Sequence, residues 1–186
     1  MIDNLFFEES QLRRIGNNVI IGKTVRIRYP ELVEIGDNVI IDDFTYISVS
    51  LLISSNVHIS AGCKLIGGRR AKVEIGEFST LAPNVVLAAG SDDYISGIAT
   101  PTVPLKYKGN AEIGNIIIGS HCIIGANSTV LPNVILHDGA AVGAQSLIKN
   151  DIEEWTLHGG VPARYLRNRN QDEILRLEKK LKEQNK

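Results

Sequence analysis

Aliphatic residues recur at every sixth position along most of the chain. They form four series: Ile15, Ile21 and Ile27; Ile35, Ile41, Ile47, Ile53, Ile59 and Leu65; Ile75, Leu81 and Leu87; and Ile118, Ile124, Val130, Leu136, Val142 and Ile148. A period of six matches neither the 3.6-residue period of an α-helix nor the two-residue period of a long strand. It indicates short strands joined by tight corners, with each of these anchors pointing into a shared core.

The residues that follow the anchors are typical of sharp turns. Gly often stands directly after an anchor, and Asn or Asp follows, as in Gly16-Asn17-Asn18 and Gly36-Asp37-Asn38. These residue types tolerate the positive φ angles that a tight corner requires. If three six-residue units close one triangular coil, the anchors build about six coils, stacked about 4.8 Å apart. The pattern therefore predicts an all-β fold, a parallel β-helix of about six triangular coils.

Two insertions interrupt the repeat. Residues 67–72, with the sequence Gly-Gly-Arg-Arg-Ala-Lys, separate two anchors, and their three cations suit either a solvated corner or an anion contact. Of these two, the solvated corner is the favoured reading. The second insertion, about residues 88–117, is long for a loop inside a compact repeat and therefore indicates function.

The two ends of the chain depart from the repeat. Residues 5–12 are expected to cap the open first coil. At the other end, Ile174, Leu175, Leu177 and Leu181 stand among charges at helical spacing, which predicts an amphipathic helix over residues 170–186 that packs on its own prism or on a neighbouring subunit. The expected organisation is one repeat domain over residues 1–169 followed by this helix.

Composition excludes several classes of protein. Twenty Lys and Arg nearly balance 21 Asp and Glu, which leaves no global field to collect nucleic acid. No stretch approaches the length of about 20 apolar residues that a membrane span needs. The first ten residues lack a basic leader and an apolar run, so no secretory signal is expected. Cys63 and Cys122 fall inside the repeat, which predicts two buried, reduced thiols and a cytoplasmic protein.

Several units resemble those of the hexapeptide-repeat acyltransferases, particularly the galactoside and maltose acetyltransferases. The similar segments are Ile15-Gly-Asn-Asn-Val, Ile35-Gly-Asp-Asn-Val, Ile124-Gly-Ala-Asn-Ser and the closing Gly159-Gly-Val-Pro-Ala-Arg-Tyr-Leu-Arg, within residues 13–169. The resemblance implies a left-handed β-helix, a homotrimer, and transfer of an acetyl group from acetyl-CoA to a sugar. The repeat alone would also suit a non-catalytic scaffold.

On the acceptor side, the sequence departs from the family. The sugar acetyltransferases carry a catalytic His before the long loop, whereas this chain has no His between His58 and His121 and offers Ser91, Asp92, Asp93 and Tyr94 instead. Because an amine needs less help from a base than a hydroxyl does, the missing His favours an amino sugar as the acceptor. We expect this acceptor to be a nucleotide-linked amino sugar or another precursor of surface polysaccharide.

We expect Asp92 or Asp93 to orient the acceptor or take its proton, and Ser91, Tyr94 and Asn84 to bind it. O-acetylation of a sugar remains the alternative. His58 is the best candidate base.

The remaining histidines are weaker candidates. His121 and His137 are expected to face solvent, and His158 lies near the closing motif. A zinc hydratase on the same fold would need three His ligands, but His58, His121 and His137 occupy unlike corner registers, so no metal site is expected.

On the cofactor side, the resemblance assigns residues of the last coils to acetyl-CoA. Ala126 and Ala144 supply backbone hydrogen-bond groups, and Lys149-Asn150 stands where the family often has Thr-Lys. Pro162 and Ala163 turn the chain back along the prism. Arg164 and Arg167 are suited to phosphate because a guanidinium binds phosphate oxygens in pairs, with a solvated basic tail as the alternative reading.

Overall fold

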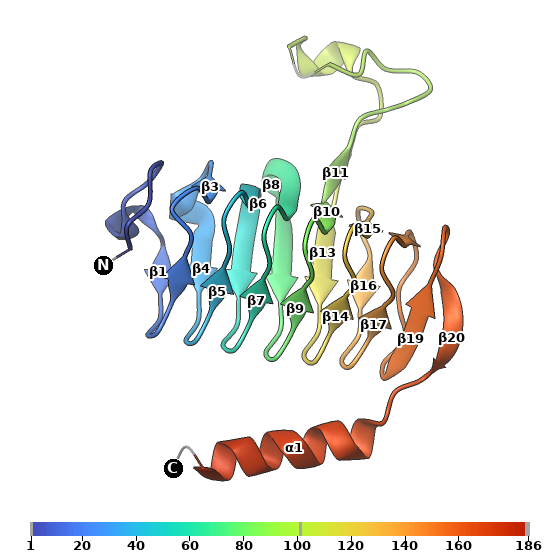
Figure 1. The fold of residues 1–186 in the computed structure, drawn as a ribbon. Helices are drawn as coiled ribbons and strands as arrows, with labels where there is room; N and C mark the ends of the chain where they lie inside the picture. The colour runs from blue at the N-terminus through green and yellow to red at the C-terminus, as the bar shows by residue number, and fades with distance from the viewer. Residues whose placement is uncertain (1, 101, 185–186) are drawn as a thin grey trace.

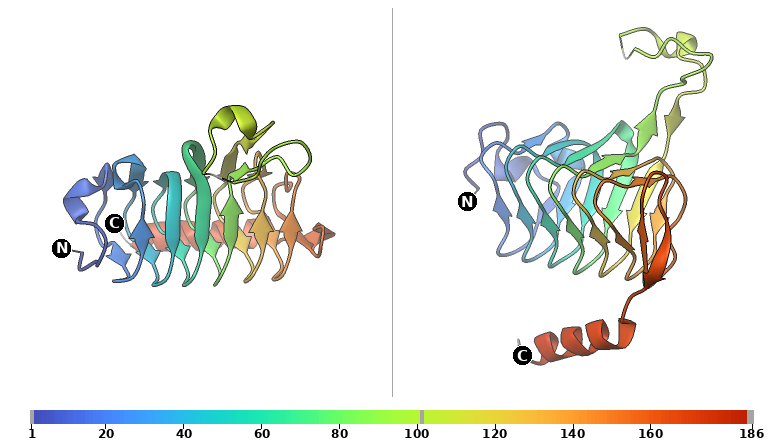
Figure 2. Two further views of the ribbon diagram at one scale, coloured as in Figure 1. Left: turned by 90° about the horizontal axis from the view of Figure 1, so that it is seen from above. Right: turned by 45° about the vertical axis from the view of Figure 1, so that its right-hand side comes forward.

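The chain folds into a prism of stacked coils, as the repeat predicts (Figures 1 and 2). The structure is a computed structural model that describes residues 2–100 and 102–184. The coils wind left-handed. Three flat faces of short parallel strands enclose a column of aliphatic side chains.

Each face is a ladder of strands contributed by successive coils. The first face contains β1 (Arg14–Ile15), β4 (Val33–Ile35), β13 (Asn115–Ile118), β16 (Ile135–Leu136) and the second halves of β6 (Tyr46–Ile53) and β8 (Lys64–Ile75). The second face contains β2 (Ile20–Ile21), β5 (Ile40–Ile41), β7 (His58–Ile59), β9 (Thr80–Leu81), β14 (Ile123–Ile124), β17 (Ala141–Val142), β19 (Thr156–Gly159) and the returning β20 (Arg164–Asn168). The third face contains β3 (Arg26–Ile27), β10 (Val86–Ala88), β15 (Thr129–Val130), β18 (Leu147–Ile148) and the first halves of β6 and β8.

The strand register confirms the predicted coils. Their anchors are Ile15, Ile21 and Ile27 in coil 1; Ile35, Ile41 and Ile47 in coil 2; Ile53, Ile59 and Leu65 in coil 3; Ile75, Leu81 and Leu87 in coil 4; Ile118, Ile124 and Val130 in coil 5; and Leu136, Val142 and Ile148 in coil 6. Seventeen of these eighteen side chains are buried, and Ile15 in the end coil is half-buried. An incomplete coil 7 follows, in which Ile152 bridges to Leu136 and β19 pairs with β17. The prism is thus about one turn longer than the anchors alone predict.

The corner between the first and second faces carries a column of residues with positive φ. Its members are Asn18, Asn38, Asn56, Phe78, His121, Gly139 and Trp155. In coils 1–3 the asparagine amides bond to one another at 3.1 and 3.3 Å. From coil 4 onward the column is aromatic except at Gly139 in coil 6, which is unusual because bulky residues rarely adopt positive φ. The rings of Phe78 and His121 stack with centroids 5.2 Å apart, and the ring of Trp155 lies 5.8 Å from that of His121.

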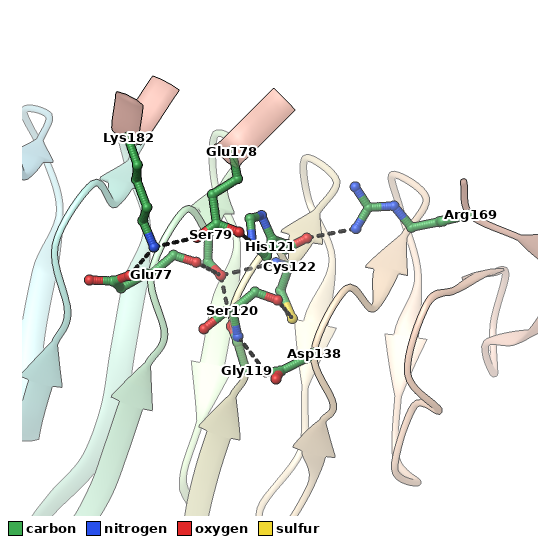
Figure 3. A network of polar contacts seen from close by, with 10 residues as sticks. All are labelled: Glu77, Ser79, Gly119, Ser120, His121, Cys122, Asp138, Arg169, Glu178 and Lys182. Carbon is green, nitrogen blue, oxygen red and sulfur yellow. Dashed lines mark hydrogen bonds and ion pairs between the residues drawn. The ribbon is translucent and has the colours of Figure 1, made fainter. Parts of the chain in front are cut away.

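The C-terminal helix α1 (Gln171–Gln184) runs back along this aromatic column, so it packs on its own prism (Figure 3). Glu178 Oε2 lies 3.0 Å from His121 Nε2, and the ammonium of Lys182 lies 5.5 Å from the centroid of the Phe78 ring. His121, predicted to face solvent, retains only 11% of its side-chain exposure. That prediction was wrong because α1 covers this corner; His137 is exposed as predicted.

Arg169 joins the helix to the last coils. Its Nη1 donates to the carbonyl oxygens of His121 and Gly139, each at 2.6 Å, and its backbone N–H donates to Trp155 at 2.7 Å. One residue thus ties the end of β20 to coils 5, 6 and 7, and its contact with His121 is drawn in Figure 3. Burial lowers the pKa of its guanidinium.

The other end of the prism and the core match the sequence-based expectations. A 3-10 helix (Glu9–Gln11) with buried Phe7 and Leu12 covers coil 1, and a second one (Pro30–Leu32) turns coil 1 into coil 2. Cys63 and Cys122 are buried free thiols. Within residues 2–100 and 102–184, no helix has the length and apolar character to cross a membrane.

The long insertion forms an arm that projects from the corner between the third and first faces (Figures 1 and 2). Its stem is an antiparallel pair, β11 (Gly90–Ser91) and β12 (Glu112–Ile113), and a 3-10 helix (Leu105–Tyr107) lies near its tip. The predicted boundaries, 88 and 117, extend slightly too far because Ala88 ends β10 and residues 115–117 belong to β13. The projecting part is therefore residues 90–113.

Candidate active site

Two aspartates hold the limbs of the arm together. Asp92 pairs with Lys108 at 2.7 Å, and the Lys108 side chain is only 13% exposed. Asp93 Oδ1 accepts the backbone N–H groups of Ile95 and Ser96, and its Oδ2 accepts that of Asn110. Both carboxylates therefore connect the outgoing limb to the returning limb.

The bonds to Asp93 bear on its predicted role in proton transfer. The backbone N–H groups of Asn110, Ser96 and Ile95 lower the pKa of the Asp93 carboxyl. A carboxylate whose pKa is lowered is a weaker base. Both oxygens of Asp93 already accept hydrogen bonds within the arm, which suits this residue to organising the arm. Ser91 Oγ donates to the carbonyl oxygen of Asp92 at 3.2 Å, and the Tyr94 side chain stands free in solvent, 90% exposed.

His58 lies on β7 in the second face, with its side chain outward. Its Nε2 is 2.8 Å from Asp42 Oδ2 in the coil below, and both side chains are slightly less than half exposed. An aspartate that orients an accessible imidazole is an arrangement suited to a general base.

His58 and the acids of the arm do not meet within one chain. The arm leaves the prism between the third and first faces, whereas His58 lies on the second face, as the places of β7 and β11 in Figure 1 show. The partners of Asp92 and Asp93 all belong to the arm itself. The residues predicted to be catalytic therefore form two separate groups on the monomer.

Three other predicted site residues share one corner. Asn84, Ala126 and Ala144 lie between the second and third faces, in coils 4, 5 and 6 respectively. Backbone hydrogen bonds join these coils: the N–H of Asn127 donates to the carbonyl of Pro83, and the N–H of Gln145 donates to the carbonyl of Ala126. The predicted acceptor residue Asn84, with φ of 61°, thus adjoins the predicted cofactor residues.

The backbone N–H groups of Ala126 and Ala144 have no acceptor among the residues that the structure describes. At the corner between the first and second faces, the equivalent N–H groups of Asn17, Asp37 and Ser120 donate to a side chain of the next coil: Asp37, Ser55 and Asp138 respectively. Alanine at 144 offers no side-chain oxygen to Ala126. Because these two donors are on the surface, they are open to a ligand that brings carbonyl groups.

The closing segment shapes the C-terminal end of this corner. Two serine hydroxyls hold this segment in place: Ser128 Oγ accepts a hydrogen bond from the N–H of Ser146, and Ser146 Oγ accepts one from the N–H of Gly160. The peptide bond before Pro162 is cis, and Ala163 N–H donates to the carbonyl of Leu147.

Three predicted cofactor residues border one small cavity. A space of about 190 Å³ at the end of the prism is lined by Lys149, Ala163 and Arg164, together with His158. Arg167 lies on the other side of β20, opposite Leu157, and borders a different hollow. The structure thus brings together part of the predicted set and separates Arg167 from it.

His158 is a site residue that the anchor pattern missed. It pairs in register with the anchor Val142, so its ring enters the end of the core, and Nε2 is buried without a partner among the described residues. Burial lowers its pKa, and the ring of Tyr165 packs against it edge-on at 5.8 Å. A signal existed, because His158 follows Ile152 by six and continues the repeat.

Within the described ranges, no group of three or more His, Cys, Asp or Glu side chains is placed to hold a metal ion. His58 bonds to Asp42, His121 lies beneath α1, and His137 is exposed elsewhere on coil 6.

Comparisons with known proteins place this architecture. Residues 115–150 match the family model "Bacterial transferase hexapeptide (six repeats)". The chain is 36% identical over 182 residues to dTDP-4-amino-4,6-dideoxy-D-glucose acyltransferase of Escherichia coli, covering 95% of this chain and 92% of that protein.

Solved structures give the same result. AntD, an N-acyltransferase from Bacillus cereus in complex with dTDP and 3-hydroxybutyryl-CoA, superposes with a TM-score of 0.90 at 34% identity, over 98% of this chain and 100% of that chain. A variant of AntD in which a serine is replaced by cysteine, in complex with dTDP-4-amino-4,6-dideoxyglucose and coenzyme A, gives a TM-score of 0.89 at 34% identity, over 97% and 98% of the two chains. With its six-residue repeat, left-handed prism and projecting arm, the chain belongs to the hexapeptide-repeat family of sugar acyltransferases and is an acyltransferase.

Proposed function

We propose that this enzyme transfers an acyl group from acyl-CoA to the amine of a nucleotide-linked amino sugar, as a step in surface-polysaccharide synthesis. The unpaired N–H groups of Ala126 and Ala144, beside Asn84, carry the proposal. Two amide donors in consecutive coils, about 4.8 Å apart, suit the amide carbonyls of a pantetheine arm. The acceptor class follows the similar E. coli protein, whose name specifies a dTDP-linked 4-amino sugar, and AntD, a variant of which was solved in complex with such a sugar.

Beyond the pantetheine, the phosphates of CoA would reach the cavity at the end of the prism. Lys149 and Arg164 supply positive charge there, and Ala163, which follows Pro162, forms part of its wall. Arg groups bind phosphate oxygens through two parallel N–H donors. Acetyl-CoA is the proposed donor, and 3-hydroxybutyryl-CoA is the second to test because AntD was solved with it.

The reaction is a direct displacement. The acceptor nitrogen forms a bond to the thioester carbonyl carbon, the C–S bond breaks, and CoA leaves as the thiol. His58, oriented by Asp42, takes the proton of the attacking amine and returns it to the departing sulfur, and backbone N–H groups stabilise the developing oxyanion. Asp92 orients the amine, and Asp93 with Ser91 and Tyr94 shapes the arm that presents it.

The active enzyme is proposed to be a homotrimer. On the arm, Tyr94, Ile95 and Leu105 are 90%, 95% and 70% exposed to solvent. Exposed apolar side chains that gather on a projecting arm are typical of a surface that a partner covers. A second copy would also bring His58 of one subunit toward the arm of another, which a single chain does not do. The free thiols of Cys63 and Cys122 fit the cytoplasm as the compartment.

The accessible His58–Asp42 pair favours one second candidate, O-acylation of a sugar hydroxyl, because a hydroxyl acceptor depends on a base more strongly than an amine does. Paired acceptors that differ only in amine or hydroxyl separate the two functions.

The test combines binding and turnover. We expect calorimetry to show CoA binding, and thiol release from acetyl-CoA or 3-hydroxybutyryl-CoA to depend on a dTDP-linked 4-amino sugar. His58→Ala should lower kcat by about 10²-fold or more, as expected for loss of a general base, without changing CoA affinity. His137→Ala, an exposed His elsewhere on the prism, is the control. Absence of CoA binding would instead support a non-catalytic scaffold.

A further inference from the structure

The third face of the prism changes character along its length. Its outward side chains form one ladder in register, from coil 1 to coil 6: Arg26, Tyr46, Lys64, Val86, Thr129 and Leu147. Cations and a tyrosine occupy coils 1–3, and uncharged residues occupy coils 4–6. Arg28, on the same face, is also exposed and lies next to Tyr46 and Tyr29; a hydrogen bond to the Tyr46 hydroxyl is the main cause that raises its pKa.

The basic insertion at residues 67–72 adds to this end of the face. Arg69 reaches back to coil 1, where it pairs with Glu31 at 2.7 Å and lies 5.3 Å from the centroid of the Tyr29 ring. Arg28 lies over the same ring at 5.6 Å. Tyr29 therefore brings two guanidinium groups together, and Arg70, which follows Arg69 in the sequence, is also exposed.

Four of these cations are uncompensated. Among the described residues, Arg26, Arg28, Lys64 and Arg70 form no ion pair, whereas Arg69 is neutralised by Glu31. The insertion alone is best explained as a solvated corner, but the folded chain adds three further cations, Arg26 and Arg28 from coil 1 and Lys64 from coil 3. A concentration of unpaired positive charge in a protein of net charge -1 is an electrostatic site for an anion.

The position of this cationic face relates it to the arm. The arm begins directly after coil 4, where Ala89 N–H donates to the carbonyl of Ile66 in the strand that leads into the basic insertion. The insertion and the arm thus leave the same edge of the prism, in coils 3 and 4 (Figure 1). Coil 1 is three layers from coil 4, about 14 Å at about 4.8 Å per layer.

We propose that Arg26, Arg28, Lys64 and Arg70 bind the diphosphate of the nucleotide-linked acceptor. The guanidinium groups of Arg26 and Arg28 provide paired donors for phosphate oxygens, and Lys64 provides a point charge. This assignment rests on the proposed function. It places the two substrates at opposite ends of the prism, with the nucleotide over coils 1–3, acyl-CoA over coils 5–7, and the amino sugar between them beneath the arm.

The test uses nucleotide binding, which does not require turnover. The variants are Arg28→Gln and the double change Arg28→Gln with Lys64→Gln. The control is Arg14→Gln, which removes an exposed arginine of coil 1 on the first face, 3.4 Å from Glu34. In calorimetry with dTDP alone, we expect the double variant to bind about tenfold more weakly or worse, the loss of at least one charge-assisted hydrogen bond. The dTDP affinity of Arg14→Gln and the acyl-CoA affinity of the double variant should remain unchanged.

Kinetics give an independent measurement. In the double variant, the KM for the nucleotide-linked amino sugar should rise by a similar factor while kcat changes little, and inorganic pyrophosphate should lose its inhibition in parallel. Unchanged dTDP affinity in the double variant, or no dTDP binding by the wild type, would overturn the assignment while leaving acyl transfer intact. Conversely, if the wild type acylates no nucleotide-linked sugar but the double variant still loses dTDP, the proposed function fails and the nucleotide site stands.

Discussion

The imidazole Nε2 of His121 lies 3.0 Å from Glu178 Oε2, so a corner residue of coil 5 bonds directly to the C-terminal helix. The two side chains are only 11% and 19% exposed. Phe78 and Trp155 flank the imidazole, and Lys182 holds the same glutamate. This contact, rather than a continuous apolar seam, determines where α1 lies, because the helix has no buried residue.

Replacing Glu178 by Gln should weaken the docking of α1. The change removes a charged partner from both His121 and Lys182 and should lower the free energy of unfolding by about 1–2 kcal/mol. Urea denaturation measures the loss, and amide hydrogen exchange in residues 174–184 should become faster. Glu183→Gln, at an exposed position of the same helix, is the matched control. Equal effects of the two changes would show that the contact contributes nothing.

The same carboxylate predicts a dependence of stability on pH. The hydrogen bond from Lys182 is the main cause that lowers the pKa of Glu178 below its ordinary value of 4.5, and His121 adds to it. An acid whose pKa falls on folding stabilises the fold above its unfolded pKa and loses that contribution as pH falls through the folded value. The difference in unfolding free energy between wild type and Glu178→Gln should therefore be fully present at pH 6 and should shrink as the pH falls below about 4.5. A difference that stays the same as the pH falls from 6 to 3 would contradict this.

Gly139→Ala should destabilise the end of the prism. A Cβ at this position would lie 2.3 Å from the Trp155 indole, and the backbone φ is +72°. Gly68→Ala is the control, because Gly68 has φ of +81° but nothing within 4 Å of an added Cβ. Both changes place an alanine in the left-handed backbone region. The additional loss of unfolding free energy in Gly139→Ala, about 1–3 kcal/mol, therefore measures the overlap of the new Cβ with the ring. Thermal unfolding gives the loss, and the fluorescence of the single tryptophan should shift only in Gly139→Ala.

Asp93→Ala should loosen the arm without affecting the prism. The change removes the acceptor of three backbone N–H groups on both limbs of the arm. Trypsin should then cleave faster after Lys106, while the thermal midpoint changes little. Asp93→Asn should be intermediate, since an amide oxygen can still accept from Ile95 and Ser96 but the amide nitrogen cannot accept from Asn110. Equal cleavage rates in the wild type and both variants would show that Asp93 does not organise the arm.

The two thiols should be unreactive in the folded protein. Burial raises the pKa of Cys63 to about 11 and that of Cys122 to about 12. Because the thiolate is the reactive species, alkylation at pH 8 should be slow for both and should become fast in denaturant. Fast labelling of either cysteine under native conditions would show that its coil opens.

The repeat could be predicted in detail because each anchor carries its own signal. An aliphatic residue at every sixth position specifies both the turn and the inward direction, and the register follows once three units close a coil. The aromatic corner could not be predicted in the same way. Phe78, His121 and Trp155 occupy positions where a solvated Asn is usual, and their burial depends on a helix that arrives from far along the chain.

The site was predicted as a set of residues but not as an arrangement. Ala126 and Ala144 follow their anchors by the same interval as Asn17 and Ser120, and only the stacking of coils shows that their N–H groups lack a side-chain acceptor. Similarly, His58 and Asp93 are 35 positions apart in the sequence, but which face each occupies depends on how many units separate them. The bonds that Asp93 makes inside the arm belong to an irregular loop, for which periodicity carries no information.

The layered construction of the prism restricts how enzymes of this design can diverge. The cations of coils 1–3 and the unpaired N–H groups of coils 5 and 6 are separated by a whole number of layers. A corner can accept an insertion, as at residues 67–72 and in the arm, but a change in the number of six-residue units must add or remove a complete coil, because a partial coil would misalign every anchor beyond it. The span offered to a pair of substrates therefore changes in discrete steps, and finer adjustment of acceptor length is left to the arm.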